Sequence, residues 1–366
     1  MTRPPTPLPA LVEGSRIIVC TGSGGVGKTT TAAAIALGAA QRGRRACVVT
    51  IDPARRLGDA LGIAELTNDP RRVNGPWPGE LWALMLDTKS TFDHVVATNA
   101  SSPAQAQAIY ANRFYRNISA VLSGTQEYMA MEKLHQLYAE SRFDLIVVDT
   151  PPTRHALDFL HAPGRLTRLL DNRIFRLLMR PTRAGLRAVN MATQLFLRTI
   201  SKVVGSDVVR DAVGFFEAFE GMEQGFRDRA QEVLALLGDP VTAWVLVTTP
   251  RPAAVAEALY FAEQLQESKI DVDAVVVNRT YPAFPALTSV PDAGLGPQLA
   301  LLVENLQDLS RVASGEEESV ARLTARVPAP VARVPYLDTD VHDLDGLAEV
   351  AEALFGPAAE RAGLTP

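Results

Sequence analysis

Cysteine is scarce in this chain of 366 residues, which contains only Cys20 and Cys47. Both lie in short apolar runs that are typical of buried strands, where a free thiol behaves as a small hydrophobic residue. Two isolated cysteines cannot build a metal site from cysteine pairs, and they give no disulfide pattern. We therefore expect a protein of the reducing cytoplasm with no zinc or iron–sulfur centre on its own cysteines.

Long hydrophobic runs are also missing. No stretch approaches the roughly 18 to 20 apolar residues that a membrane-spanning helix needs. Residues 1–14 are rich in proline and lack the apolar region of a signal peptide, so we expect a disordered tail there. The net charge of −5 argues against a nucleic-acid partner. These absences predict a cytoplasmic protein whose contact with a membrane, if it has one, is peripheral.

Apolar runs that alternate with helical patterns make up most of the chain. The runs are nearly continuous, which is typical of strands buried on both faces of a parallel sheet. Strands are predicted at 16–21, 46–51, 81–86, 143–149, 242–249, 272–278 and 331–337. Helices are predicted between them at 29–42, 125–141, 253–268 and 343–355. This order indicates a doubly wound α/β fold with a mostly parallel sheet flanked by helices.

One long segment has no strand pattern. Residues 159–238 have helical periodicity throughout and separate the fourth predicted strand from the fifth. We therefore expect an α/β core made of residues 15–158 and 239–357, interrupted by an all-helical insertion.

Residues 21–31, TGSGGVGKTTT, fit two phosphate-binding patterns at once. The glycines have the G-x-G-x-x-G spacing of a dinucleotide-binding turn, for which Asp52 would be the acid that binds ribose. The stretch also spells G-x-x-x-x-G-K-T, the phosphate loop of P-loop ATPases and GTPases. Lys28 suits a triphosphate, Thr29 suits Mg²⁺, and Asp149 ends a buried strand where P-loop proteins carry a metal-orienting acid. The P-loop interpretation is therefore favoured.

The loop binds phosphate mainly through its backbone. Its glycines let successive N–H groups turn toward the phosphate oxygens, and the following helix adds the partial positive charge of its N-terminus. Lys28 would neutralise the β and γ phosphates, Thr29 would coordinate Mg²⁺, and Asp149 would hold the metal through water. The predicted ATP-binding loop consists of Gly22, Ser23, Gly24, Gly25, Val26, Gly27, Lys28, Thr29 and Thr30.

Two further segments resemble the switch regions of one ATPase family. DPARRLGDALG (52–62) follows the second predicted strand, and DTPPTRHALDFL (149–160) follows the fourth. They are similar to D-P-A-x-x-L-x-D-A and D-T-x-P-T-x-H-x-L of the ArsA family. This family includes the arsenite-pump ATPase and the eukaryotic ATPase that targets tail-anchored membrane proteins. Weaker matches at 123–127 and 275–278 extend the resemblance over about residues 16–350.

The resemblance implies a P-loop ATPase that works as a dimeric nucleotide switch with ATP and Mg²⁺. Asp52 matches the family's catalytic aspartate, which positions the attacking water at the γ-phosphate that Lys28 binds. Asn278 matches the asparagine that reads adenine, with segment 334–340 on the same side. For both residues, the alternative is a structural role in a turn or at a strand end. The predicted switch residues are Asp52, Pro53, Asp59, Asp149, Pro152, Arg154 and His155, of which Arg154 stands at a variable position of the motif.

Position 23 departs from the family pattern. The family carries a lysine there that reaches the phosphates bound by the other subunit, whereas this chain has Ser23. A serine cannot supply that cation. We therefore expect a heterodimer with a lysine-bearing paralogue in preference to a homodimer. The rival hypothesis is that Arg154 supplies the charge within the same chain.

The cysteine pairs of the family are absent as well. Without them, the resemblance implies neither a zinc-clamped homodimer nor a thiolate site for arsenite, so arsenite transport is disfavoured. The chain also corresponds to one half of the arsenite-pump ATPase, which holds two such halves in one chain.

The insertion is both apolar and basic. In the targeting branch of the family, the equivalent insertion forms a groove for the hydrophobic helix of a client protein. Its arginines recur mostly every three or four residues, which suits an anionic membrane surface. The alternative is that the apolar residues form the insertion's own core and a dimer contact. The apolar residues are Leu166, Leu169, Leu170, Phe175, Leu177, Leu178, Met179, Met191, Leu195, Phe196, Leu197, Ile200, Phe215, Phe216, Phe219 and Met222, and the arginines are Arg165, Arg168, Arg173, Arg176, Arg180, Arg183 and Arg187.

Two classes of function follow from these features. The leading hypothesis is an ATP-driven switch that handles a hydrophobic or membrane-associated client. The alternative is a metabolic P-loop enzyme, such as an ATP-dependent ligase, or a reductase-type electron donor. The electron donor would need cysteines for an iron–sulfur cluster, and the ligase would need a small-molecule pocket instead of a large apolar insertion.

Overall fold

The computed structural model describes residues 8–52, 56–116, 125–151, 206–282 and 296–356. The chain divides into two compact units, which are described separately below. The first unit consists of Met1–Met85, Leu137–Leu157 and Gly238–Pro366, and the second of Leu86–Gln136 and Asp158–Leu237.

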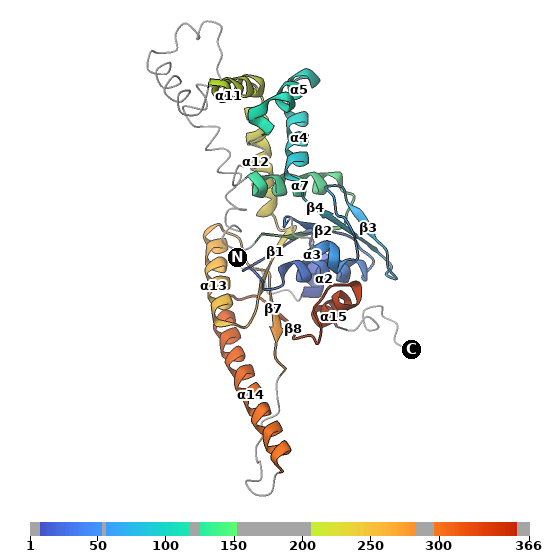
Figure 1. Cartoon of the computed structure of the whole chain (residues 1–366), viewed down its shortest axis with the longest axis vertical. Helices are drawn as coiled ribbons and strands as arrows, with labels where there is room; N and C mark the ends of the chain where they lie inside the picture. The colour runs from blue at the N-terminus through green and yellow to red at the C-terminus, as the bar shows by residue number, and fades with distance from the viewer. Residues whose placement is uncertain (1–7, 53–55, 117–124, 152–205, 283–295, 357–366) are drawn as a thin grey trace. The chain divides into compact units, whose positions relative to one another are not determined.

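An eight-stranded sheet forms the centre of the first unit (Figure 1), in the order β3-β4-β2-β5-β1-β6-β7-β8. Neighbouring strands are parallel except for β3 and β4, which are antiparallel. The mostly parallel, doubly wound fold and all seven predicted strands are confirmed, whereas the short edge strand β3 was not predicted. The strands are β1 (Ile17–Gly22), β2 (Arg45–Thr50), β3 (Arg71–Val73), β4 (Glu80–Met85), β5 (Leu145–Asp149), β6 (Thr242–Thr248), β7 (Ala274–Thr280) and β8 (Val331–Pro335).

Helices cover both faces of this sheet. One face packs against α2, which in turn packs against α15, and small residues (mostly Ala and Thr) let α2 approach the strands closely. Side chains of β6 alternate between the faces, so Val245 and Val247 join the core under α2 while Trp244 points to the other face, where α13 packs. The helices of this unit are α1 (Leu8–Gly14), α2 (Lys28–Ala40), α3 (Arg56–Ala60), α13 (Pro252–Glu267), α14 (Pro297–Thr324) and α15 (Leu344–Phe355).

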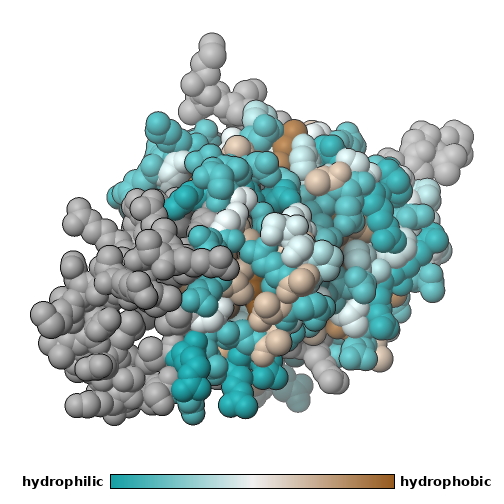
Figure 2. All heavy atoms as spheres, turned by 90° about the horizontal axis from the view of Figure 1, so that it is seen from above, coloured by the Kyte–Doolittle hydropathy of each residue, from teal (hydrophilic) through white to brown (hydrophobic). Residues whose placement is uncertain are grey.

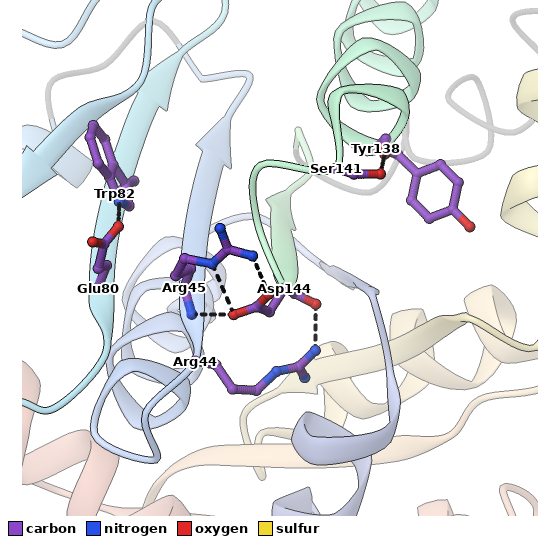
Figure 3. A network of polar contacts seen from close by, with 7 residues as sticks. All are labelled: Arg44, Arg45, Glu80, Trp82, Tyr138, Ser141 and Asp144. Carbon is purple, nitrogen blue, oxygen red and sulfur yellow. Dashed lines mark hydrogen bonds and ion pairs between the residues drawn. The ribbon is translucent and has the colours of Figure 1, made fainter.

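The predicted disordered tail is wrong for residues 8–14, which form helix α1. Leu8, Leu11 and Val12 are buried in the core of the first unit. The end of α1 is held by Arg44, whose guanidinium donates hydrogen bonds to the carbonyl oxygens of Val12, Ser15 and Asp144. Figure 3 shows Arg44 beside Asp144, at the start of β5. A long-range contact from a single arginine is invisible to local sequence patterns, which is why the helix was missed.

The second unit is larger than the predicted insertion. It contains residues 158–237, but also residues 86–136, which the sequence analysis assigned to the α/β core. Aromatic contacts join the two parts, because Tyr115 stacks on Phe92 at 5.4 Å and on Phe215 at 6.1 Å. The helices of this unit are α4 (Thr88–Asn99), α5 (Pro103–Ala111), most of α7 (Thr125–Glu140), α11 (Ser206–Phe219) and α12 (Glu223–Leu237).

Three residues from the apolar set of the predicted insertion lie in the interior of the second unit. Phe215, Phe219 and Met222 are buried, and Phe219 packs on Phe226 with ring centroids 4.9 Å apart. For these residues the structure favours the alternative hypothesis, a core for the helical unit itself. The apolar and basic residues at 165–200 lie outside the described residues. Within the described ranges, no helix combines the length and the apolar character that crossing a bilayer requires.

We expect Arg44→Ala to lower the free energy of unfolding of the first unit by about 2 kcal/mol, because three carbonyl oxygens lose a charged donor. The matched control is Arg45→Ala. Arg45 is exposed and forms an ion pair with Asp144 at 2.8 Å (Figure 3), so its removal should have a much smaller effect. Urea unfolding followed by tryptophan fluorescence measures this unit, because Trp77, Trp82 and Trp244 all lie in it. Equal losses in the two variants would contradict the role of Arg44.

Candidate nucleotide site

Three neighbouring strands bring the predicted site residues together. In the parallel pairing of β5 with its neighbours, Asp149 lies opposite Cys20 of β1 and opposite Thr50 of β2. The carboxyl ends of β1, β2 and β5 therefore meet at one edge of the sheet. The phosphate loop leaves β1 there, and Asp52 follows β2 at the same edge. This is where ligands bind in open α/β sheets.

Two glycines of the loop lie at positions that a side chain cannot occupy. A Cβ on Gly22 would lie 2.0 Å from the carbonyl oxygen of Val247 in β6. Gly27 has a left-handed φ of 93°, and a Cβ there would lie 2.2 Å from the Asn278 amide nitrogen. Gly27 also precedes α2 without a side-chain cap, which leaves the helix N-terminus suited to an anion. The glycine spacing therefore reflects close packing of the loop against β6 and against Asn278 of β7.

Lys28 is buried beneath the loop. Its side chain is 7% exposed, and Nζ donates a hydrogen bond to the carbonyl oxygen of Ser23 at 2.8 Å. Burial lowers the pKa of Lys28, and the nearby carboxylates of Asp149 and Asp52 oppose this shift. An ammonium has three donors, so Lys28 can hold the loop and still offer N–H groups to phosphate oxygens.

Asp149 has a buried carboxyl group whose two oxygens differ in their hydrogen bonding. Its Oδ2 accepts hydrogen bonds from the hydroxyls of Thr29 at 2.7 Å and Thr50 at 2.9 Å. Its Oδ1 is buried without a hydrogen-bond partner among the described residues. Burial raises the pKa of Asp149 to about 6, while the two threonines and Lys28 lower it. An open carboxylate oxygen beside a threonine hydroxyl fits a hydrated Mg²⁺.

Asp52 is half-buried, and its backbone N–H donates to the Thr50 hydroxyl at 3.2 Å. Its side chain lines a cavity of about 620 Å³ together with loop residues and Asp149. A cavity of this size is in the range of small-molecule sites. The predicted site residues that line it are Gly25, Gly27, Lys28, Thr29, Thr30, Asp52, Asp59, Asp149 and Asn278.

Asn278 lies at the end of β7 and contacts the loop directly. Its Nδ2 donates to the carbonyl oxygen of Val26 at 2.9 Å, and its Oδ1 accepts from the backbone N–H of Arg279 at 3.0 Å. The amide retains a second hydrogen and a second lone pair, so contact with adenine stays a prediction. Residues 335–337 and 339–342 line the same cavity, in and beyond the segment predicted to lie on the adenine side.

Several predicted site residues cannot be placed. Pro53, Pro152, Arg154 and His155 lie outside the described residues, so their switch roles stay predictions. Ser23 is buried at the start of the loop and is 5% exposed, and its carbonyl oxygen accepts a hydrogen bond from Lys28.

The sequence analysis missed Thr50, which connects two acids of the site. Its hydroxyl donates to Asp149 and accepts from the backbone of Asp52. A polar residue at the end of the apolar run ACVVTI was the available signal. Arg56 and Arg279 also line the cavity and were not predicted.

Several known proteins are similar to this chain in sequence. Residues 15–288 match the sequence profile of the anion-transporting ATPase family. The ATPase ASNA1 homolog of Babesia bovis is 28% identical over 262 residues, which are 70% of this chain and 64% of that protein. A protein of Aquifex aeolicus, provisionally named arsenical pump-driving ATPase 1, is 24% identical over 93% of this chain and 79% of its own length. The ATPase GET3 of Phaeosphaeria nodorum is 25% identical over 75% of this chain and 80% of its own length.

We expect Thr50→Val to weaken the apparent affinity for Mg²⁺ about tenfold, because residues that orient a metal-binding group contribute about 10- to 100-fold. Valine keeps the shape of threonine but removes the hydroxyl that holds Asp149. Thr50→Ser keeps the hydroxyl and is the control. The measurement is ATP turnover as a function of Mg²⁺ concentration at saturating ATP. An unchanged Mg²⁺ dependence in Thr50→Val would show that Thr50 does not position the metal site.

Proposed function

The chain belongs to the ArsA family of anion-transporting ATPases, and we propose that it uses Mg-ATP hydrolysis to switch its affinity for a hydrophobic client. The single observation that supports the ATP site best is the carboxyl group of Asp149. It is buried behind the phosphate loop and accepts a hydrogen bond from the Thr29 hydroxyl. Its Oδ1 has no hydrogen-bond partner among the described residues. A buried carboxylate with one unsatisfied oxygen is costly, and a metal–nucleotide complex would compensate that cost.

The residues of the site would divide the work of phosphoryl transfer to water. The loop N–H groups and the N-terminus of α2 would bind the phosphates, and Lys28 would carry positive charge to the β and γ positions. Bound Mg²⁺ would neutralise charge on the same phosphates, held by Thr29 directly and by Asp149 through water. Asp52, on the cavity wall, would orient the attacking water and accept its proton.

The segment that follows Asp52 would couple the ATP site to a conformational switch. Asp52 is followed closely by α3, whose Leu57 and Ala60 are buried in the first unit. A change at Asp52 on loss of the γ-phosphate would therefore be transmitted to a packed helix. Asp59 of that helix lines the cavity as well, which supports its proposed place in the switch.

The client is proposed from the insertion sequence and from the similarity to GET3 and ASNA1 proteins. The apolar and basic residues at 165–200 would contact a hydrophobic helix or an anionic membrane surface, from the cytoplasm. Among the residues coloured in Figure 2, hydrophobic groups on the drawn face are small and separate. Arsenite is a poor candidate for the cargo, because Cys20 and Cys47 are both buried in strands and a thiolate site needs accessible cysteines.

We propose that two subunits complete the site. Ser23 has no charge to offer to a second nucleotide, so a lysine-bearing paralogue is the preferred partner and a second copy of this chain is the alternative.

Lys28→Ala and Asp52→Asn should separate binding from hydrolysis. We expect Lys28→Ala to weaken ATP binding and lower turnover by at least about 10²-fold, because the phosphates lose the buried ammonium. Asp52→Asn should still bind Mg-ATP but hydrolyse it about 10²- to 10⁴-fold more slowly. Titration with a fluorescent ATP analogue and phosphate release measure the two steps. Full activity in Lys28→Ala would contradict the ATP site, and lost binding in Asp52→Asn would make Asp52 structural.

The partner can be tested by reconstitution. We expect the isolated chain to hydrolyse ATP slowly and a lysine-bearing paralogue from the same organism to raise the rate about 10³-fold or more, the effect of a cation supplied by another subunit. Light scattering gives the mass of each species during the assay. Fast turnover by a homodimer of the isolated chain would contradict the heterodimer, and its loss in Arg154→Ala would assign the cation to Arg154.

A further inference from the structure

Arg279 has an unusual backbone conformation at the carboxyl end of β7. Its φ is 60°, a left-handed value that residues with a Cβ rarely adopt. In the pairing with β8, Asn278 lies opposite Val334 and Thr280 opposite Pro335, so Arg279 falls in the irregularity between them. The bulge turns Arg279 out of the ladder of strand hydrogen bonds.

The bulge directs two neighbouring side chains at the phosphate loop. Asn278 Nδ2 lies 2.9 Å from the carbonyl oxygen of Val26, and Arg279 Nη1 lies 3.4 Å from that of Gly25. Lys28 Nζ donates a hydrogen bond to the carbonyl oxygen of Ser23 in the same loop. A loop that turns its N–H groups toward phosphate must direct carbonyl oxygens elsewhere, and these need donors. Three side chains supply them here.

We propose that Arg279 is a positioning residue for ATP. With Asn278 it holds the outer side of the loop in its phosphate-binding form, and its guanidinium places positive charge at the loop. This inference rests on the proposed ATP site and adds a residue to it. The ligand it serves is the polyphosphate of a nucleotide.

Burial does not explain the position of Arg279. Its side chain is exposed, so it contributes little to the core, and a glycine would fit the left-handed conformation better. Ser141, Lys269 and Arg279 are the described non-glycine residues with a positive φ, and of these Arg279 lines the nucleotide cavity. Arg279 also lines both the nucleotide cavity and a second cavity of about 630 Å³ on the Ser23 side of the loop. Its charge therefore lies next to both sides of a loop in which position 23 is neutral.

Three substitutions of Arg279 separate charge, hydrogen bonding and backbone conformation. We expect Arg279→Ala to raise the Kd and KM for Mg-ATP about tenfold, the loss expected for one charge-assisted hydrogen bond, with a smaller effect on kcat. Arg279→Lys should recover most of the affinity, because lysine keeps the positive charge and can still donate a hydrogen bond to the loop. Arg279→Gly should bind Mg-ATP as weakly as Arg279→Ala, because glycine relaxes the backbone but has no guanidinium.

The control variant is Arg251→Ala. Arg251 is exposed and lines the second cavity near the loop, so it tests whether removing any nearby positive charge weakens ATP binding. The assays are titration of the full chain with Mg-ATP, steady-state phosphate release and thermal unfolding without nucleotide. We expect Arg251→Ala to bind ATP as the parent chain does.

Two results would overturn the proposal. Unchanged affinity in Arg279→Ala would remove the role of the guanidinium, and parental affinity in Arg279→Gly would reduce the position to a backbone requirement. Lys28→Ala, measured alongside, keeps this outcome separate from the proposed function. If Lys28→Ala binds ATP weakly while Arg279→Ala keeps the parental affinity, only the role of Arg279 fails. Undiminished ATP binding by Lys28→Ala would contradict the ATP site itself.

Discussion

The geometry of the site depends on one buried carboxyl group, that of Asp149. Its side chain lies between β1 and β2 at the end of β5, where two threonine hydroxyls and a buried lysine offset the cost of removing a charge from water. The two hydroxyls come from α2 and β2, so a single carboxylate ties the phosphate loop's helix to two strands. Among the described residues, only one oxygen of Asp149 has hydrogen-bond partners, so the other is available to a ligand. The same group therefore joins structural elements and offers an oxygen to the proposed Mg²⁺.

The shape of the phosphate loop is set by the contacts of its backbone. Gly22 lies against the Val247 carbonyl group and Gly27 against Asn278, so the loop is packed on β6 and β7 at the two ends of its glycine pattern. Side chains from β7 and α2 take up the carbonyl oxygens of Ser23, Gly25 and Val26. These contacts within the protein constrain the loop, and a constrained loop loses less conformational entropy when it binds a ligand.

Much of the α/β core could be predicted from the sequence because its strands are buried on both faces. Continuous apolar runs mark such strands, and the glycine pattern marks the loop between β1 and α2. Features that depend on distant contacts could not be predicted. Helix α1 depends on Arg44, the grouping of residues 86–136 with the helical unit depends on aromatic packing around Tyr115, and the hold on Asp149 depends on Thr50. Arg279 was missed because a bulge has no periodicity.

The division into two units constrains how ATP hydrolysis could act on the proposed client. All described residues that line the nucleotide cavity belong to the first unit, whereas the apolar insertion belongs to the second. The chain crosses between the units four times. Two of these crossings are at Leu157/Asp158, soon after Asp149, and at Leu237/Gly238, just before β6 pairs with β1. The segment that follows Asp149 is also the one that resembles the family's second switch. Asp149, the acid proposed to hold the metal, is therefore separated from the second unit by a short stretch of sequence. In the proposed mechanism, a change near residue 150 on loss of phosphate would reach the second unit along this covalent connection.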